Sequence, residues 1–276
     1  MALADWFLAL HRPGEPLLIP NPWDAGSARV LASLGFRALA TTSSGFAATL
    51  GRPDGSVTRD EALRHAAVIV AATDLPVSAD LENGYAHEPD GVAATIEGAI
   101  EAGLAGASIE DFTGDPDAPI YDLSLAAERV AAAAGAAHAG PGRLVLTARA
   151  ENYLHGRSDL DDTIARLRAY RDAGADVLYA PGLVRQDDIR AVVEAVDRPV
   201  NVLALPAGPT VPELADLGVA RISVGGAFAF AALGALVAAG RELLEQGTYG
   251  FWETAAVGRV AAGVAMRKPD APTIGR

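Results

Sequence analysis

Residues 76–110 read PVSADLENGYAHEPDGVAATIEGAIEAGLAGASIE and hold one complete strand-helix-strand unit. The apolar run Val77–Leu81 is typical of a buried strand, and the alanine-rich run Gly91–Ala102 is typical of a helix. Gly103 allows the left-handed conformation that ends a helix, because it has no Cβ. A second apolar run, Ala107–Glu110, predicts the next strand. The stretch therefore predicts two parallel strands joined by a helix.

The same unit repeats along the chain. Three more helical runs end on a glycine that precedes a strand-like run, at Gly35, Gly174 and Gly218. The predicted strands cover residues 17–20, 38–41, 77–81, 107–110, 144–148, 177–180, 200–204 and 222–224. The predicted helices cover residues 25–34, 59–73, 91–102, 125–138, 160–173, 186–196, 211–217 and 228–246. Unbroken alternation of this kind over about 250 residues predicts a (β/α)8 TIM barrel.

Composition fits one large domain. The 276 residues are 50% hydrophobic with a mean hydropathy of +0.21, so the chain can bury a large core as one barrel or as two ordinary domains. The repeat favours a single barrel domain over residues 1–276, with a short N-terminal helix and a C-terminal helical tail. An open doubly wound sheet is the alternative, but no G-x-G-x-x-G follows the first strand.

Charge and cysteine content exclude several classes of function. A formal charge of -13 and a pI near 4.7 argue against nucleic acid or an anionic membrane as a partner. The absence of cysteine excludes a disulfide framework, Cys-ligated zinc and a catalytic thiol. Met1–His11 lacks the basic and long apolar regions of a signal peptide, so we expect a cytoplasmic protein.

One long segment, from Arg221 to Arg241, has no charged residue between its ends. Its start, Ile222–Gly226, is predicted as a strand and a glycine turn, which leaves Ala227–Gly240 too short to cross a bilayer. A helix that is apolar on all faces at this length is buried in its own chain or against another subunit. We expect a subunit interface here.

Two acids end the strand at the centre of the opening stretch. Asp80 and Glu82 stand at alternate positions, so their side chains point to the same side of the chain. Two converging carboxylates repel unless a cation or a proton lies between them, and Mg2+ is the natural occupant. The alternative is a strand that ends in solvated acids followed by a turn at Gly84.

Polar residues also follow the neighbouring predicted strands. Strand two runs into residues 41–46, strand four into Glu110 and Asp111, and strand five into Arg149 and Glu151. Each could singly be a loop residue. However, the carboxyl ends of all barrel strands meet at one rim, where TIM-barrel enzymes have their active sites. Together these residues predict an active site at that rim.

Five short motifs stand in order along the chain. They are Asn21-Pro22-Trp23-Asp24-Ala25-Gly26-Ser27-Ala28, Ser44-Gly45-Phe46, Asp80-Leu81-Glu82-Asn83-Gly84-Tyr85, Ile109-Glu110-Asp111 and Ala148-Arg149. In order and spacing they resemble the motifs of the isocitrate lyase/phosphoenolpyruvate mutase superfamily, over roughly residues 15–250. Such enzymes act on 2-oxo or 2-hydroxy acids through an enolpyruvate-like intermediate.

The resemblance implies an assembly, a metal site and a substrate site. It implies that the eighth helix is exchanged between subunits, giving a homodimer or homotetramer. The implied ligands of Mg2+, with Mn2+ as a substitute, are Asp80 directly and Asp54, Glu82 and Glu110 through water. The implied substrate-binding residues are Ser44, Gly45, Phe46, Asp80, Arg149 and Asn201, and the proposed catalytic residues are Arg149, Glu110 and Tyr121.

The loop after the fourth strand departs from the family pattern. Family lyases that cleave isocitrate or methylisocitrate carry Lys-Arg-Cys-Gly-His there, whereas residues 112–121 read FTGDPDAPIY, without Cys, Lys or Arg. We therefore expect a carbon-carbon lyase or decarboxylase for a small 2-oxo or 2-hydroxy carboxylate, of the 2-methylisocitrate lyase-like or oxaloacetate decarboxylase-like branch. The alternatives are a phosphonopyruvate hydrolase or phosphoenolpyruvate mutase, and an oxo-acid-binding protein with little activity.

Several secondary roles stay open at this stage. Tyr121, Tyr85, His87 and His155 are the candidate proton donors, and Glu151 is predicted to orient Arg149, to act as a base or to form a structural ion pair. Asn201 either touches the far end of the substrate or is an ordinary interior amide. Tyr179–Gly182 near the end of strand six and Leu205–Pro209 after strand seven carry no charge, so we expect a small or apolar far pocket. The tail is predicted as one helix with Trp252, Val257 and Val260 on a buried side, ending in a Pro-rich terminus at Pro269 and Pro272.

Overall fold

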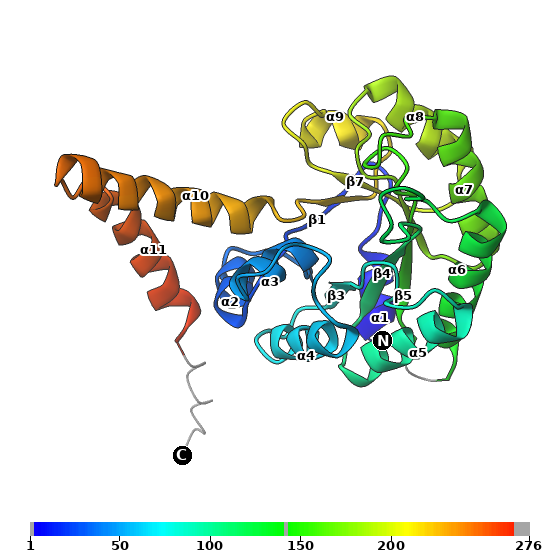
Figure 1. Cartoon of the computed structure of the whole chain (residues 1–276), viewed down its shortest axis with the longest axis horizontal. Helices are drawn as coiled ribbons and strands as arrows, with labels where there is room; N and C mark the ends of the chain where they lie inside the picture. The colour runs from blue at the N-terminus through cyan, green and yellow to red at the C-terminus, as the bar shows by residue number, and fades with distance from the viewer. Residues whose placement is uncertain (1–2, 141–142, 268–276) are drawn as a thin grey trace, which may run out of the picture.

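The computed structural model describes residues 3–140 and 143–267. Its centre is one sheet of eight parallel strands in the order β1-β8-β7-β6-β5-β4-β3-β2. The amide of Ala40 on β2 donates to the carbonyl of Pro20, just after β1, at 3.0 Å, which closes the sheet into a barrel (Figure 1). The strands are β1 (Leu17–Ile19), β2 (Leu39–Ala40), β3 (Val77–Asp80), β4 (Gly106–Glu110), β5 (Val145–Arg149), β6 (Val177–Tyr179), β7 (Val200–Leu203) and β8 (Arg221–Ser223). The predicted TIM barrel is confirmed.

Helices alternate with the strands and surround the barrel. They are α1 (Leu3–Ala9), α2 (Ala25–Ser33), α3 (Ser43–Thr49), α4 (Arg59–Val70), α5 (Pro89–Glu101), α6 (Leu123–His138), α7 (Leu160–Asp172), α8 (Gln186–Ala195), α9 (Val211–Asp216), α10 (Ala227–Arg241), a π-helical turn η1 (Glu242–Gln246) and α11 (Trp252–Ala265). The four predicted helix-ending glycines have positive φ, of 94° at Gly35, 81° at Gly103, 107° at Gly174 and 81° at Gly218. These glycines set the repeat because other residues rarely adopt that conformation.

Residues 44–46, one of the five motifs, lie in α3. The hydroxyl of Thr42 accepts the amide of Gly45 at 3.3 Å, and this N-cap starts the helix directly after β2. A Cβ at Gly45 would lie 2.6 Å from Cγ2 of Thr42 and 3.1 Å from Cβ of Ala229. Only glycine therefore lets α3 pack this closely against the start of α10.

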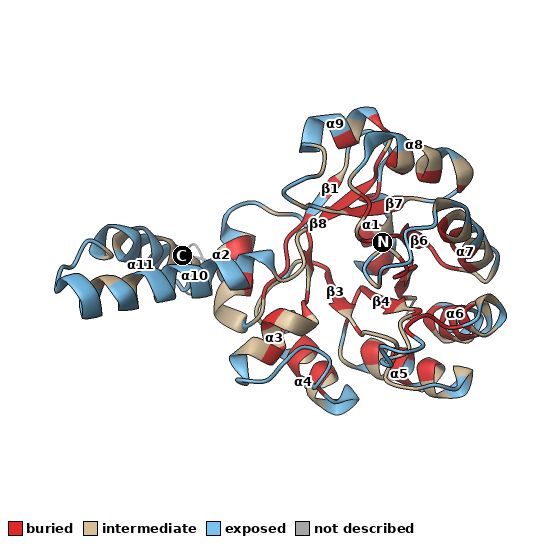
Figure 2. Cartoon of the chain, turned by 45° about the horizontal axis from the view of Figure 1, so that its top comes forward, coloured by how far each residue is buried: buried red, intermediate tan, exposed pale blue. Residues whose placement is uncertain are grey.

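The core lies between the strands and the outer helices, and α1 closes the amino-terminal end of the barrel. Figure 2 shows the strands almost wholly buried and the outer faces of the helices exposed. Phe7 of α1 is fully buried and packs with Leu10, Val145 and Val177 in a separate apolar cluster. Only the carboxyl-terminal end of the barrel is therefore left open for a ligand.

The eighth helix does not pack on its own barrel. Figures 1 and 2 show α10 projecting away from the barrel, with α11 turning back toward α2. The predicted buried side of the tail is wrong for a single chain, since Trp252, Val257 and Val260 are 56%, 72% and 68% exposed. Within residues 3–140 and 143–267, nothing covers that side. Pro269 and Pro272 lie outside the described residues.

This arm also meets the length and composition of a membrane span. Residues Ala227–Gln246 form one continuous helix of 20 residues. The most apolar 18-residue window of this helix has a mean hydropathy of 1.6, and only 6% of that window is buried. The helix is longer than the uncharged stretch considered from the sequence, because it continues through Arg241, Glu242 and Glu245. Exposed apolar surface of this extent marks an interaction surface.

Candidate active site

Arg149 is the centre of a charge cluster at the carboxyl ends of the strands. Its Nη1 lies 2.9 Å from Oδ1 of Asp80, and its Nη2 lies 3.2 Å from Oε2 of Glu110. Glu151 is 2.8 Å from the same guanidinium and accepts from its Nε. All four side chains are at most one-fifth exposed. The predicted role of Glu151 in orienting Arg149 agrees with these contacts.

The strand ladder brings these residues together. Glu110 ends β4 and pairs in register with Arg149, the last residue of β5, while Asp80 ends β3 next to β4. The chain then continues from β3 in an unusual conformation, because Glu82 and Tyr85 have positive φ values of 47° and 55°. Non-glycine residues rarely adopt such values, and they cluster at functional sites.

A buried arginine holds the turn after β3 in this conformation. Arg129 of α6 is 1% exposed, and it donates to the carbonyls of Asn83, Ala86 and His87. Its guanidinium also lies 4.2 Å above the ring of Tyr121. The turn that carries Glu82 is therefore fixed from below by a rigid, multiply bonded side chain.

The acidic rim, defined here as Asp54, Asp80, Glu82 and Glu110, carries excess negative charge. Burial, together with the charges of Asp80 and Asp54, raises the pKa of Glu82 to about 7. Burial also raises the pKa of Glu110 well above its usual value, against the opposing effect of Arg149. Several neighbouring carboxylates share one guanidinium, so the rim favours binding of an added cation.

The residues of the rim fit a hard divalent ion held mainly through water. Their donors are all carboxylate oxygens, which Mg2+ prefers, and Mg2+ commonly keeps several water ligands beside one or two carboxylates. Within residues 3–140 and 143–267, no three His, Cys, Asp or Glu side chains stand close enough to chelate a metal together.

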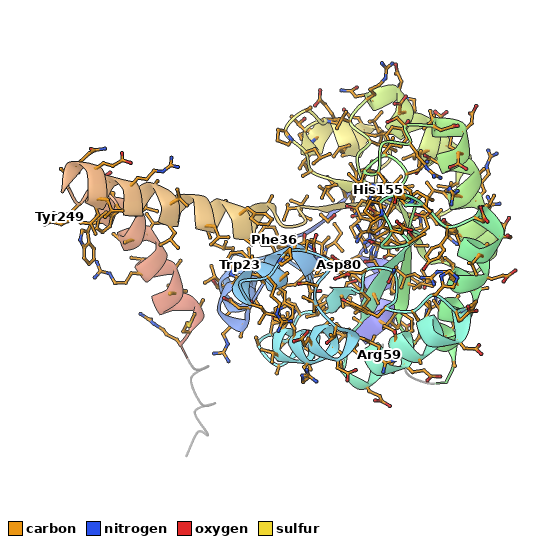
Figure 3. All side chains as sticks on the ribbon, viewed as in Figure 1. Trp23, Phe36, Arg59, Asp80, His155 and Tyr249 are labelled. Atoms are coloured by element: carbon orange, nitrogen blue, oxygen red, sulfur yellow. The ribbon has the colours of Figure 1, made fainter. Side chains whose placement is uncertain are left out.

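A cavity of about 150 Å³ opens beside this cluster, inside the barrel. Asp80, labelled in Figure 3, ends β3 and lines this cavity. The cavity is lined at its upper end by Thr42, Ser43, Ser44, Asp54, Asp80, Arg149, Leu154, Pro181, Gly225 and Gly226. Its deeper wall includes Ile19, Ser78, Ser108, Tyr179, Leu203, Arg221 and Ser223. The cavity suits a short ligand, since an enclosed space of this size holds a molecule about as large as benzene.

The predicted residues divide between this cavity and a neighbouring one. Ser44, Asp54, Asp80 and Arg149 line this cavity, and Glu82, Glu110 and Tyr121 line the other; three line neither. The ring of Phe46 stacks on His65 at a centroid distance of 3.8 Å and does not line the cavity. Asn201 lies behind the cavity wall, where its amide donates to Ser223 at 3.0 Å. Gly45 is buried behind Ser44, and its amide is taken up by the helix cap.

The candidate proton donors occupy a neighbouring cavity. Tyr121 is buried, and its hydroxyl lies 3.3 Å from Nδ1 of His87. This second cavity, of about 780 Å³, is lined by Tyr121, Tyr85 and His87 together with Asp54, Glu82 and Glu110. His155 stacks on Phe112 at 3.9 Å and lies 3.9 Å from Glu151. The acidic rim thus separates the two cavities.

The loop after β4 is short and internally bonded. Phe112 and Ile120 form an isolated antiparallel bridge, and the amide of Thr113 donates to the carbonyl of Pro119 at 2.8 Å. The tip of the loop, residues 114–118, is exposed. It carries Asp115 and Asp117 and no cation.

The comparisons with known proteins assign the chain to a family. A family model described as phosphoenolpyruvate phosphomutase matches residues 7–244. The chain belongs to this family. One relative is the uncharacterized protein MT2054 of Mycobacterium tuberculosis. It is 36% identical to this chain over 224 residues, which are 79% of this chain and 81% of the relative. The 2-methylisocitrate lyase of Halalkalibacterium halodurans is 31% identical over 208 residues, 72% of this chain and 66% of that enzyme.

Solved structures agree with this assignment. A provisionally described lyase/mutase from Burkholderia cenocepacia J2315 is 56% identical, with a TM-score of 0.92 and coverage of 98% of each chain. Oxaloacetate acetylhydrolase in complex with oxalate is 27% identical, with a TM-score of 0.83 over 94% of this chain and 93% of that one. 2,3-Dimethylmalate lyase is 28% identical, with a TM-score of 0.80 over 94% and 97%. The predicted superfamily is confirmed: the chain is an enzyme of the isocitrate lyase/phosphoenolpyruvate mutase superfamily.

Sequence reasoning missed part of the site. Arg221 and Tyr179 line the cavity, yet Arg221 was used only as the boundary of an uncharged segment. The expectation of a far pocket without charge is therefore wrong. The available signal was the strand pattern around residue 222, because residues on either side of Ile222 point into the barrel if Ile222 points outward.

Proposed function

We propose that this family member is a Mg2+-dependent carbon-carbon lyase or decarboxylase for a small 2-oxo or 2-hydroxy carboxylate. The observation that supports it most is Arg149, held by three carboxylates at the mouth of a small cavity. Relatives and neighbours named 2-methylisocitrate lyase, 2,3-dimethylmalate lyase and oxaloacetate acetylhydrolase all act, by their names, on short carboxylic acids.

The chain's own residues take distinct parts in the proposed reaction. Ser44 binds the carboxylate of the substrate, together with the start of α3, and Arg149 binds the oxygen on which negative charge develops when the bond to C3 breaks. Asp80 would hold the ion directly, with Asp54, Glu82 and Glu110 on its waters. When bound, Mg2+ supplies Lewis-acid stabilisation of that charge.

Protonation of the carbanion completes the proposed reaction. We assign this step to Tyr121, with Glu110 as the acid or base of the rim, because both line the cavity next to the metal residues. Burial raises the pKa of Glu110 well above its usual value, which favours its protonated form. A proton on the enolate carbon gives a product such as pyruvate.

Phosphoryl chemistry is the weaker candidate. The loop after β4 has no lysine or arginine between Phe112 and Tyr121, and its tip carries two aspartates. A phosphonyl group there would meet negative charge without a compensating cation. This loop composition favours cleavage of a carbon-carbon bond.

The exposed arm supports an oligomer with exchanged helices. A groove of about 470 Å³ runs along the outside of β1 between α2 and the start of α9, lined by Leu17, Leu18, Leu34, Phe36 and Val211 among others. Leu18 is 40% exposed although it faces the position that a barrel helix normally covers. We propose that α10 of a second copy packs here, in a cytoplasmic homodimer or homotetramer, rather than that the helix enters a membrane. Light scattering after size-exclusion chromatography tests this proposal by measuring the mass of the assembly. A protein that is monomeric and stays in solution only with detergent would contradict it.

The function is tested by an assay for release of the 2-oxo acid product on a panel of oxaloacetate, methylisocitrate, isocitrate, 2,3-dimethylmalate and phosphonopyruvate. The product measured is glyoxylate for isocitrate and pyruvate for the others. We expect release from a carbon-carbon substrate that is abolished by EDTA and restored by Mg2+. Release from phosphonopyruvate alone, with free phosphate, would replace the proposal with phosphonopyruvate hydrolysis. Binding without turnover across the panel would indicate an oxo-acid-binding protein.

A further inference from the structure

Arg221 is a buried cation without a carboxylate partner. It is 5% exposed, and no acidic side chain of residues 3–140 or 143–267 lies within ion-pair distance of it. Its Nε donates to Oδ1 of Asn201 at 2.9 Å, and its Nη1 lies 3.5 Å from Nε2 of His11. Both neighbours are neutral acceptors. We call Arg221, Asn201 and His11 the barrel floor.

An uncompensated buried charge is unfavourable in a folded protein. Taking an ion out of water costs several kcal/mol unless a counterion or a full set of hydrogen bonds replaces the solvent. Burial lowers the pKa of Arg221 to about 10, and the positive charge of Arg149 adds to this effect. A neutral side chain could make the same two contacts at less cost. The retained charge therefore points to an anion that binds Arg221 in the working protein.

The free side of this guanidinium faces the active-site cavity. Arg221 lines the cavity, and its Nη2 has no hydrogen bond to any described residue. The hydroxyl-bearing residues Ser78, Ser108 and Ser223 line the same deep part and are themselves more than nine-tenths buried. They are neutral groups that can donate to an anion. The cavity thus joins the Arg149 end to a second built, positively charged end.

We propose that Arg221 binds the second carboxylate of the substrate, which makes the substrate a short dicarboxylic acid. This inference rests on the proposed function, since the first carboxylate is placed at Ser44 and the start of α3, with the reacting oxygen at Arg149. The cavity of about 150 Å³ admits only a short chain between the two ends. A monocarboxylate would leave Arg221 without a counterion, so the enzyme should discriminate against it.

The test compares two ligands in the presence of Mg2+ by isothermal titration calorimetry. 3,3-Difluorooxaloacetate has carboxylates at both ends of a four-carbon chain, whereas oxalate has only two carbons and spans the Arg149 end alone. In Arg221→Met we expect the affinity for 3,3-difluorooxaloacetate to fall about 10- to 100-fold, the range of a lost charge-assisted hydrogen bond. The affinity for oxalate should change less than about twofold. Arg190→Met, at an exposed position on α8, makes the same change of net charge and should affect neither ligand.

The outcomes separate this inference from the proposed function. Equal losses for both ligands in Arg221→Met, or no loss for either, would overturn the subsite. Failure of both ligands to bind the wild-type protein with Mg2+ would overturn the proposed function and the subsite with it. If Arg221→Met does not fold, Arg221→Lys keeps the charge but not the planar fork, and it should weaken only 3,3-difluorooxaloacetate. The proposal would also be contradicted if folded Arg221→Lys bound both ligands as tightly as the wild-type protein does. Equal affinity of the wild-type protein for diacid and monoacid inhibitors would contradict it as well.

Discussion

The two arginines inside the barrel have opposite surroundings. Arg149, at the carboxyl end of β5, lies 2.8–3.2 Å from Asp80, Glu110 and Glu151. Arg221, at the first residue of β8, contacts only the neutral Asn201 and His11. Both are almost completely buried, so the difference is not one of solvent access.

This contrast shows how one cavity can bind both a cation and an anion. The acidic rim has more carboxylates than Arg149 can neutralise, whereas the barrel floor has a positive charge with nothing to neutralise it. A divalent ion at the rim and an anionic substrate reaching the floor would balance both ends. The net charge of -13 then does not prevent binding of an acid, because the local charges along the cavity decide it.

The largest effect is expected at the rim, for Asp80→Ala. This change removes the proposed direct ligand of the ion and one of the partners of Arg149, so kcat/KM should fall by about 10³-fold or more. Pyruvate release measured across a Mg2+ titration checks the prediction. Asp60→Ala, on the exposed face of α4, is the matched control and should leave both activity and Mg2+ dependence unchanged. Equal activity of the two variants would contradict a metal site at Asp80.

A smaller loss, of about 10²-fold in kcat, is expected for Arg149→Lys. Lysine keeps the charge but cannot donate to Asp80, Glu110 and Glu151 from one planar group, so the rim loses its fixed geometry. Steady-state kinetics at saturating Mg2+ measure this effect. Arg190→Lys on α8 serves as the control. A kcat within twofold of wild type would mean that Arg149 acts only as a counterion for the acids.

The same contrast explains what could be predicted from the sequence. The barrel was predictable because glycine marks each helix end and because apolar runs of strand length alternate with helical runs. The rim was predictable because parallel strands bring their carboxyl ends together, so Asp80, Glu110 and Arg149 had to meet. Both inferences use local patterns that the fold converts directly into position.

The floor and the arm could not be read in this way. Arg221 precedes a long apolar segment, and alternation along this three-residue strand places Arg221 inside only once Ile222 is known to face outward. Phe46 was assigned to the substrate on motif position, yet its ring turns away to stack on His65. The exposure of Val257 depends on what a second chain covers, which no pattern within one chain encodes.

The third prediction concerns packing at the amino-terminal end of the barrel, where α1 lies, and uses Gly106→Ala on β4. A Cβ there would lie 2.6 Å from Cε1 of Phe7 and 3.1 Å from the carbonyl of Val145, so α1 must shift. We expect a loss of about 1–3 kcal/mol in the free energy of unfolding, measured by urea denaturation. The control is Gly135→Ala within α6, where a Cβ meets nothing within 4 Å. This change should raise the free energy of unfolding by about 0.5–1 kcal/mol. Equal urea midpoints for the two variants would show that α1 is not tightly packed against β4.

The smallest effect concerns His11, the neutral partner of Arg221. Burial and then the nearby charge of Arg221 lower the pKa of His11 from 6.5 to about 3. The ring nitrogen Nδ1 lies 2.9 Å from the carbonyl of Phe7, so Nδ1 carries the proton and Nε2 accepts from Arg221. Above pH 6.5 the ring is neutral in the folded and the unfolded chain, and its contribution is fully present.

Below that pH the unfolded chain binds a proton that the folded chain does not, so stability falls as the pH decreases toward 3. Between pH 7.5 and pH 5.5 this single group should lower the free energy of unfolding by about 1.4 kcal/mol. His11→Gln keeps an acceptor for Arg221 but cannot titrate, so the wild-type protein should lose that much more stability than the variant over the same interval. Urea denaturation of both proteins at the two pH values isolates this difference, because all other titrating groups are shared. Parallel pH profiles would mean that His11 has the same pKa in the folded and the unfolded chain, so that the folded barrel does accept a proton beside Arg221.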